Sequence, residues 1–314
     1  MNLNLVLTAV EQAGIFSVLA LGIYITYKIL DFPDLTVDGS FPLGSAITAA
    51  MLSRGFSPLL AMPVALLAGG LAGFCTGLIH VRLKVRDLLA GIIMMTALYS
   101  VNILIAGRAN IPITTTTGMK TIFSNPLMAK LFGANAGDST APLFAVRSLR
   151  NIMLLLLIIL LIKYLIDLFL KTRLGYLLRA EGDNECLVTT LARDGGSMKI
   201  LGLSIANALV SLSGSLYCQY IKAFNLTDGT GKMVIGLAAV IIGVNIFGKI
   251  PHLRPTTAVI IGSIVYNFCI AAALKQVDSN VKNLVTALLF LVILQAGRIR
   301  LPGRKVRKKE GIHA

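Results

Sequence analysis

Apolar runs long enough to cross a lipid bilayer dominate this sequence of 314 residues. A membrane-spanning helix takes about 20 mostly apolar residues. Runs of about that length lie at 13–30, 58–80, 88–106, 151–170, 198–217, 256–274 and 283–297. Hydrophobic residues make up 56% of the chain and charged residues only 14%, which is far from the balance of a soluble domain. The sequence therefore predicts an all-α, polytopic integral membrane protein.

Two further apolar runs, 41–53 and 233–247, are too short to cross comfortably. Each follows a polar, glycine-bearing leader, LTVDGS at 35–40 and LTDGTG at 226–231. Irregular backbone exposed to lipid would leave amides without partners, so these leaders must line a protein-enclosed cavity or lie at a membrane surface. If both runs cross, the chain has about nine complete or broken spans, and the two broken ones run in opposite directions, as in an inverted repeat. If 41–53 is instead a re-entrant hairpin, the N-terminus lies inside.

The basic residues indicate the orientation. Lys and Arg number 29 against 14 Asp and Glu, so the net charge is +15. They fall between apolar runs and in the C-terminal tail, which is typical of loops facing anionic lipid and not of a nucleic-acid groove. The positive-inside rule places 82–86, 171–193, 249–254 and the tail in the cytoplasm, and therefore 107–147 outside. The N-terminus is then outside if 41–53 crosses.

Motifs of enzymes and metal sites are missing from the sequence. It contains no HExxH, no Walker sequence and no paired carboxylates within one span, and Ser213-Gly214-Ser215 has no histidine at matching depth. The four cysteines form no CxxC pair. We therefore expect neither catalysis nor a bound cofactor or metal. If transport by this chain is active, its energy must come from another chain.

Charged residues inside the predicted spans are few. Lys163 and Asp167 lie four residues apart within 151–170, on one helix face, and a structural pair is favoured over a transport relay. A proton-coupled carrier usually needs a titratable group at mid-depth, and Asp167 is the one candidate. Glu11 falls in the first apolar stretch, which lacks a basic start. No cleavable signal peptide is therefore expected.

Gly69, Gly73 and Gly77 recur every four residues and place a flat stripe on one helix face. Such a stripe lets another backbone approach closely. Packing within the subunit is favoured over a contact between subunits.

A translocation route is expected where the two leaders meet the polar face of 88–106. Small or flexible leader residues supply one part, and three polar side chains predicted to face inward supply the other. These candidates are Asp38, Gly39, Ser40, Thr96, Tyr99, Asn102, Gly229 and Gly231. The alternative for Thr96 is a hydrogen bond to its own helix backbone.

The cytoplasmic loop at 171–197 predicts a short surface helix. A helix ends near Gly175, a charged turn follows, and Asn184 caps a helix that runs to about Arg193 and is stopped by Gly195-Gly196. Such a helix can press into a groove on a partner protein. The candidate contact residues are Arg179, Glu181, Asp183, Asn184, Glu185, Leu187, Leu191 and Arg193.

Three segments carry a resemblance to a known family. Residues 174–184 (LGYLLRAEGDN) resemble the inner-loop signature LG-x3-RA-x-G-(D/N)-N of ABC importer permeases of the branched-chain amino acid and ribose type. Residues 35–46 resemble that family's DLSVG element, and 236–243 its IAAVVIGG element. Within this family, the sequence looks closest to a subgroup described as tryptophan/tyrosine transport permeases, as judged from LTVDGSF and from residues 84–99 and 107–112. The sequence departs from the family pattern at two positions. Asp38 is inserted in the DLSVG-like element, and Asn245 stands where a glycine is usual.

The resemblance implies a transport role and partners. The expected protein is a permease subunit of the bacterial plasma membrane that imports a small solute, an amino acid and more narrowly an aromatic one. It implies a homodimer or a pair with a close relative, two cytoplasmic ATPase subunits that use ATP, and an extracytoplasmic solute-binding protein. Residues 1–300 would form the permease domain, with 171–197 as its coupling loop and 301–314 as a basic tail. An ion-coupled secondary carrier and a non-transporting membrane scaffold are the alternatives.

Overall fold

The computed structural model describes residues 3–113, 121–124, 141–183, 195–248, 250 and 253–274, with isolated positions at 286–288, 291 and 295. Helices account for 85% of the structure and there is almost no sheet among these residues, so the all-α prediction is confirmed. The elements in chain order are α1 (Leu3–Ile23), η1 (Tyr24–Ile29), α2 (Val37–Ser53), α3 (Pro58–Leu83), α4 (Asp87–Ala106), β1 (Asn110–Pro112), η3 (Ile122–Ser124), α6 (Ala141–Phe169), α7 (Arg173–Asp183), α9 (Gly195–Ile221), β2 (Ala223–Asn225), η4 (Leu226–Gly229), α10 (Lys232–Ile242), η5 (Gly243–Phe247) and α11 (Pro255–Leu274).

Seven helices among the described residues are long and apolar enough to cross a membrane. They comprise α1 with η1, α3, α4, α6, α9, the η4–α10–η5 segment and α11. The span predicted at 283–297 lies almost wholly outside the described residues. The remaining predicted segment is α2, a buried helix of 17 residues. A count of nine is therefore not established.

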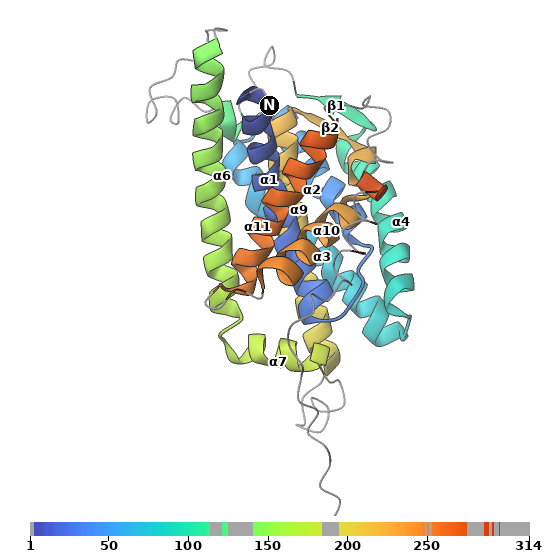
Figure 1. Cartoon of the computed structure of the whole chain (residues 1–314). Helices are drawn as coiled ribbons and strands as arrows, with labels where there is room; N and C mark the ends of the chain where they lie inside the picture. The colour runs from blue at the N-terminus through green and yellow to red at the C-terminus, as the bar shows by residue number, and fades with distance from the viewer. Residues whose placement is uncertain are drawn as a thin grey trace, which may run out of the picture.

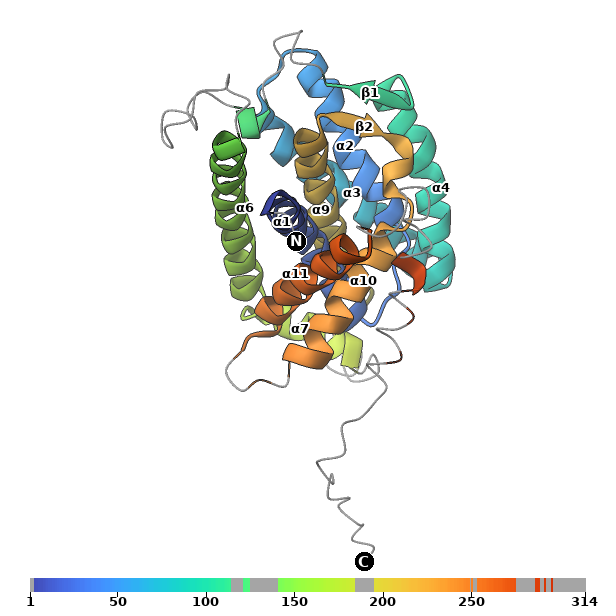
Figure 2. The ribbon, with the colours of Figure 1, turned by 45° about the horizontal axis from the view of Figure 1, so that its top comes forward.

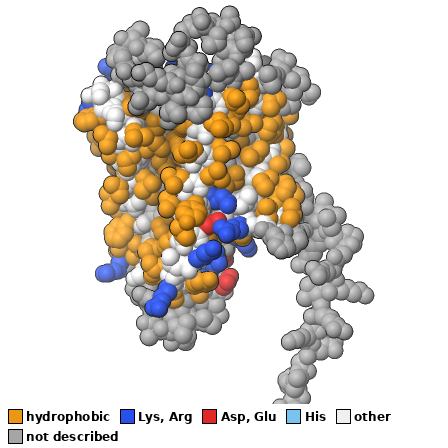
Figure 3. Space-filling model, turned by 90° about the vertical axis from the view of Figure 1, so that its left-hand side faces the viewer, with side chains coloured by type: hydrophobic (Ala, Val, Ile, Leu, Met, Phe, Trp, Pro, Cys, Tyr) orange, Lys and Arg blue, Asp and Glu red, His pale blue; other side chains and the backbone are white. Residues whose placement is uncertain are grey.

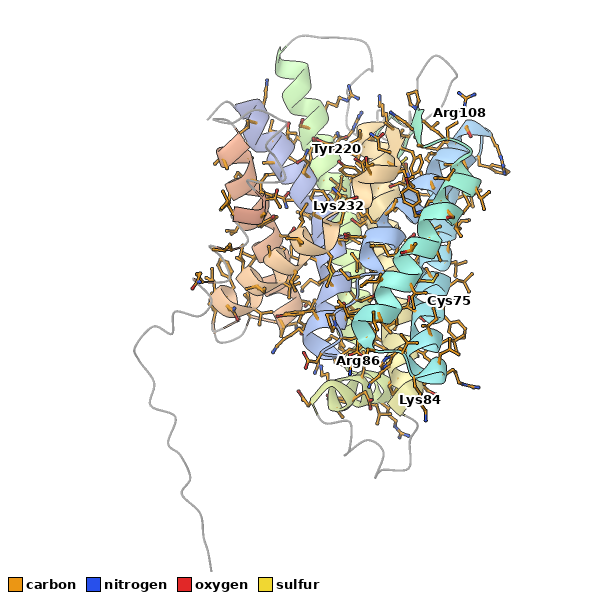
Figure 4. The ribbon with its side chains drawn as sticks, turned by 90° about the vertical axis from the view of Figure 1, so that its right-hand side faces the viewer. Cys75, Lys84, Arg86, Arg108, Tyr220 and Lys232 are labelled. Atoms are coloured by element: carbon orange, nitrogen blue, oxygen red, sulfur yellow. The ribbon has the colours of Figure 1, made fainter. Side chains whose placement is uncertain are left out.

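The long helices form an upright bundle around α1, α2 and α9, and α7 lies across its lower end (Figure 1). Hydrophobic side chains cover the middle of the face seen in Figure 3, and the visible Lys and Arg gather mainly toward the lower end. Lys84 and Arg86 lie at that same end, whereas Arg108 lies at the opposite one (Figure 4). By the positive-inside rule the end that carries α7 is cytoplasmic.

The most extensive helix pairing, between α3 and α9, rests on the glycine stripe. A Cβ built on Gly69 would collide with Ser211 and with the carbonyl of Asn207. One built on Gly73 would collide with the Leu203 carbonyl, which belongs to the same helix. The stripe therefore packs within the subunit, as predicted.

Two helices, α2 and α10, begin inside the bundle and run in opposite directions. From their adjoining N-termini, α2 rises toward the turn before α3, while α10 descends toward the cytoplasmic end (Figures 1 and 2). This is the arrangement that an inverted repeat of broken helices requires. It brings the two leader segments of the sequence together.

Two element boundaries and one strand pairing differ from the sequence-based expectations. Helix α2 begins at Val37, so only the first part of the 35–40 leader is irregular. Helix α6 begins at Ala141, inside the predicted external loop, of which 114–120 and 125–140 lie outside the described residues. Near the outer end, β1 pairs antiparallel with β2, with Ile111 opposite Phe224, a contact that local sequence patterns do not reveal.

Candidate functional site

The N-terminus of α10 is capped by a side chain from α2. The Asp38 carboxylate accepts a hydrogen bond from the Gly231 amide at 2.9 Å and another from the Met233 amide at 2.8 Å. An aspartate normally caps its own helix; here it satisfies free amides at the positive end of another helix dipole. Gly231 has φ of +79°, a left-handed conformation that suits glycine. We call this contact the α2–α10 junction.

A second feature of the junction is a gap in the hydrogen-bond ladder of α2. Pro42 lies inside the helix and has no N–H to donate to the Asp38 carbonyl. Gly229 of η4 lies directly against that carbonyl and against the Pro42 ring, where a Cβ would not fit. The predicted residues Asp38, Gly229 and Gly231 thus come together at one point.

Lys232, the first residue of α10, is buried beside the junction. Its Nζ lies 4.7 Å from the ring centroid of Phe16, 5.1 Å from that of Phe41 and 4.7 Å from that of Tyr217. Three rings from α1, α2 and α9 therefore hold one cation, an arrangement that stabilises a desolvated ammonium. The residue is placed within the bundle, between the levels of Arg108 and Arg86 (Figure 4).

A buried polar network lies on the cytoplasmic side of the junction. Ser40 donates a hydrogen bond to the Asn207 amide oxygen at 2.7 Å, and the Asn207 amide nitrogen donates to the Asp34 carboxylate at 2.7 Å. The Thr36 amide donates to the same carboxylate at 2.9 Å. This network joins the start of α2 to the middle of α9, so the segment before α2 is held to the bundle.

Of the three polar residues predicted to face inward from α4, only Asn102 does so. It is fully buried and donates a hydrogen bond to the Gly39 carbonyl at 3.1 Å. Thr96 and Tyr99 lie on the exposed face of this chain, and Thr96 donates to the Ile92 carbonyl of its own helix at 2.8 Å. The prediction of a common inward orientation is wrong for those two.

The predicted Lys163–Asp167 ion pair is present in the structure. The Lys163 ammonium lies 3.6 Å from the Asp167 carboxylate, which also accepts hydrogen bonds from Arg254 at 2.9 Å and from Thr256 at 2.7 Å. The pair thus fastens α6 to the start of α11.

The cytoplasmic loop differs from its predicted form. Residues 173–183 form the continuous helix α7, so Arg179, Glu181 and Asp183 lie on a helix and not in a turn. Gly195 and Gly196 open α9; they were predicted to end a preceding helix. The predicted coupling helix, 185–193, and its cap Asn184 lie outside the described residues, and with them Glu185, Leu187, Leu191 and Arg193.

Glu181 does not face the cytoplasm. Its side chain is buried, and its carboxylate lies 3.8 Å from the Lys199 ammonium of α9 and against Gly195. It therefore joins α7 to α9 within the chain. This ion pair could not be read from the sequence because its partner is 18 residues away, beyond a loop.

Sequence reasoning also missed several buried ionisable groups. The sequence indicates no titratable residue at mid-depth apart from Asp167, yet Asp34 and Lys232 are buried inside the bundle, and Glu11 is buried nearer its outer end. Glu11 carries one signal, a charge within an apolar run. Asp34 and Lys232 stand beside helix starts and read as loop residues, because the depth of those starts depends on the tertiary fold.

A membrane bundle in which two half-helices meet end to end is typical of permeases built from broken helices. A family model described as "Branched-chain amino acid transport system / permease component" matches residues 5–294. The chain belongs to this family. Its members are permease components of ABC import systems, which work with ATPase and binding-protein partners.

Relatives cover nearly the whole chain. A protein of Clostridioides difficile named "Tyrosine transport system permease protein" is 38% identical over 97% of this chain and 95% of its own. An uncharacterized protein of Rickettsia prowazekii is 34% identical over 78% of this chain and 79% of its own. A ribose import permease of Haemophilus influenzae is 26% identical over 93% of this chain and 84% of its own. No solved structure gives a significant match.

The expected class and location are thereby confirmed. The chain is a multi-pass permease subunit of an ABC import system in the bacterial inner membrane. Of the three functions that the sequence left open, the secondary carrier and the scaffold are not supported.

Proposed function

We propose that this chain pairs with a second copy of itself to import an aromatic amino acid, using ATP hydrolysed by separate ATPase subunits. The solute class is supported by the Clostridioides difficile relative, whose name specifies tyrosine and whose similarity extends over 97% of this chain. In this proposal an extracytoplasmic binding protein delivers the amino acid. The permease itself then supplies the route across the membrane.

The observation that carries the route is the Asp38 cap on α10. A pathway through the bundle must pass between segments that can separate, and α2 and α10 meet end to end through polar contacts there. A hydrogen bond to a charged group stabilises by about 1.5–3 kcal/mol, which a nucleotide-driven cycle can break and remake. Gly39, Ser40, Gly229 and Gly231 would border the opened route, because they flank this cap.

Replacing Asp38 tests the route. Asp38→Asn keeps one amide oxygen as an acceptor but loses the charge, so we expect uptake to fall by roughly tenfold; Asp38→Ala removes both acceptors and should fall further. The measurement is uptake of labelled L-tyrosine into proteoliposomes that hold the complete transporter. Asp31→Asn is the control, because Asp31 is exposed and its φ of 53° suits asparagine equally. Normal uptake by Asp38→Ala would remove the junction from the route.

Coupling to the ATPase is proposed for the segment that follows α7. Leu187 and Leu191 are apolar and at helical spacing, so a helix over 185–193 would present both to a groove on the ATPase. Leu187→Asp and Leu191→Asp are each expected to abolish solute-stimulated ATP hydrolysis while the permease still folds. Full stimulation in both variants would place the docking site elsewhere.

A further inference from the structure

A polar cavity of about 370 Å³ lies between the outer ends of α1, α6 and α9. Its Tyr220 lies farther toward the outer end than Lys232 (Figure 4), and Figure 2 shows α1, α6 and α9 with the outer end tilted toward the viewer. The volume falls in the range of about 300–1,000 Å³ typical of small-molecule sites. The lining residues are Thr8, Glu11, Phe123, Arg147, Ser148, Asn151, Tyr220 and Lys222.

The floor of the cavity carries a carboxylate held by neutral donors. Glu11 is 4% exposed. It accepts a hydrogen bond from the Asn151 amide at 3.0 Å and one from the Tyr220 hydroxyl at 2.9 Å. Among the described residues no Lys or Arg lies within ion-pair distance of this carboxylate, and the charge of Arg147 acts on it only from farther away. A buried carboxylate with no cation in direct contact is incompletely compensated, so an arriving ammonium would be stabilised there.

A second acceptor lies beside the first. Asn151 is 8% exposed, and its Oδ1 has no hydrogen-bond partner among the described residues, although its Nδ2 is fixed by Glu11. Buried amide oxygens are nearly always paired, so an orphan that lines a cavity indicates a ligand that donates to it. A primary ammonium has three N–H donors and can serve both acceptors.

Two cations, Arg147 and Lys222, line the same cavity. Burial lowers the pKa of Lys222, and the charge of Arg147 lowers it further. An anionic group between them would relieve that repulsion. The neighbouring Arg150 is already committed to the backbone, since it donates to the Phe123 carbonyl at 2.6 Å.

We infer that this cavity binds a zwitterion, a molecule with a primary ammonium beside an anionic group. The ammonium would bind Glu11 and Asn151, and the anionic group would bind Arg147 and Lys222. Phe123 and Tyr220 pack edge to face, with ring centroids 6.0 Å apart, and give the cavity an aromatic wall. This assigns the permease a ligand site of its own near the outer surface.

Two sources provide that chemistry at the outer surface, a free amino acid and the headgroup of an aminophospholipid. Only binding of a free amino acid depends on the solute class proposed above; binding of a lipid headgroup does not. The full-length permease is purified without the ATPase and placed in phosphatidylcholine nanodiscs. One arm measures equilibrium binding of labelled L-tyrosine, and the other measures retained phosphatidylethanolamine by native mass spectrometry after exposure to a mixed-lipid extract.

Glu11→Gln is expected to lower the binding affinity of the ligand by roughly tenfold or more, because the ammonium loses its buried counter-charge. The double variant Arg147→Gln/Lys222→Gln should weaken binding similarly, and it disturbs the packed interior less because Arg147 is exposed and Lys222 is only partly buried. Arg108→Gln is the matched control, since Arg108 is exposed at the same end and outside the cavity (Figure 4). Loss of tyrosine binding identifies the amino acid as ligand, and loss of the lipid identifies the headgroup.

The inference is overturned if the wild type retains neither probe, or if the Glu11 and double variants match the wild type in both arms. Asp38→Ala separates this outcome from a failed transport proposal. It should lose uptake while binding at the cavity persists; if it binds neither probe, the cavity is not a separate site.

Discussion

Replacing Gly73 by alanine is expected to abolish the accumulation of folded permease, whereas the same change at Gly70 is expected to leave it intact. Both glycines lie in α3, three residues apart. A Cβ at Gly73 would collide with the Leu203 carbonyl and lie 2.9 Å from the Asn207 Cβ. At Gly70 the nearest atom, the Ala208 Cβ, would be 3.7 Å away, an ordinary contact.

The collision at Gly73 involves the backbone of α9, which cannot rotate away as a side chain can. Overpacking a core costs about 1–3 kcal/mol where side chains adjust, and more where helices must separate. Separating α3 from α9 would also move Asn207, which holds Asp34 and Ser40 behind the junction. Alanine at Gly70 is expected to be neutral or stabilising, because it favours helix by up to about 1 kcal/mol over glycine.

Size-exclusion chromatography of tagged variants in mild detergent, together with thermal unfolding, measures this difference. Equal yields and unfolding temperatures for Gly73→Ala and Gly70→Ala would show that the two helices separate without penalty. Close packing of the stripe would then not be what holds the bundle together.

The spans and the glycine stripe were predictable because both follow from local rules. A run of apolar residues must cross the bilayer whatever its neighbours are, and a glycine every fourth residue leaves one face flat. The stripe's partner helix was not predictable, since nothing in α9 marks Leu203 or Asn207 as its counterpart. Similarly, the Lys163–Asp167 pair was visible from its spacing, but its partner Arg254 was not.

The start of α2 was misplaced because its signals point the wrong way. Asp38, Gly39 and Ser40 are residues that favour caps and turns, and Pro42 usually marks the first turn of a helix. In the structure Asp38 caps α10 instead, which frees α2 to begin at Val37. The local signal was real, but it belonged to a helix almost 200 residues away.

The orientation of α4 failed for a different reason. Apolar residues surround this helix almost evenly, so no periodic stripe indicates which face is buried. Polar residues are then the remaining guide to the inner face, and this guide holds for Asn102 and fails for Thr96 and Tyr99. In lipid, a threonine can satisfy its hydroxyl on its own backbone and remain outside.

The buried face of α7 is linked to the α2–α10 junction by a short stretch of chain. Gly182 lies against the Ile29 carbonyl, and Leu178 is fully buried. Asp38 follows Ile29 by nine residues in the chain. Between the two, Asp34 is held in place by a hydrogen bond from Asn207. A displacement of α7 by the ATPase would therefore act on the end of η1, and through it on the start of α2.

We therefore expect Gly182→Ala to uncouple ATP hydrolysis from transport. The added Cβ would collide with the Ile29 carbonyl and lift α7 from η1, so nucleotide-driven movement would no longer reach Asp38. In the reconstituted complex, uptake should fall below about a tenth while basal ATPase activity persists without solute stimulation. Asp183→Ala is the control: Asp183 is the next residue and is exposed, and a surface charge contributes only about 0–1 kcal/mol, so its effect should be small. If Gly182→Ala imports at the wild-type rate while Asp183→Ala does not, force passes through charges at the surface of α7 and not through its contact with η1.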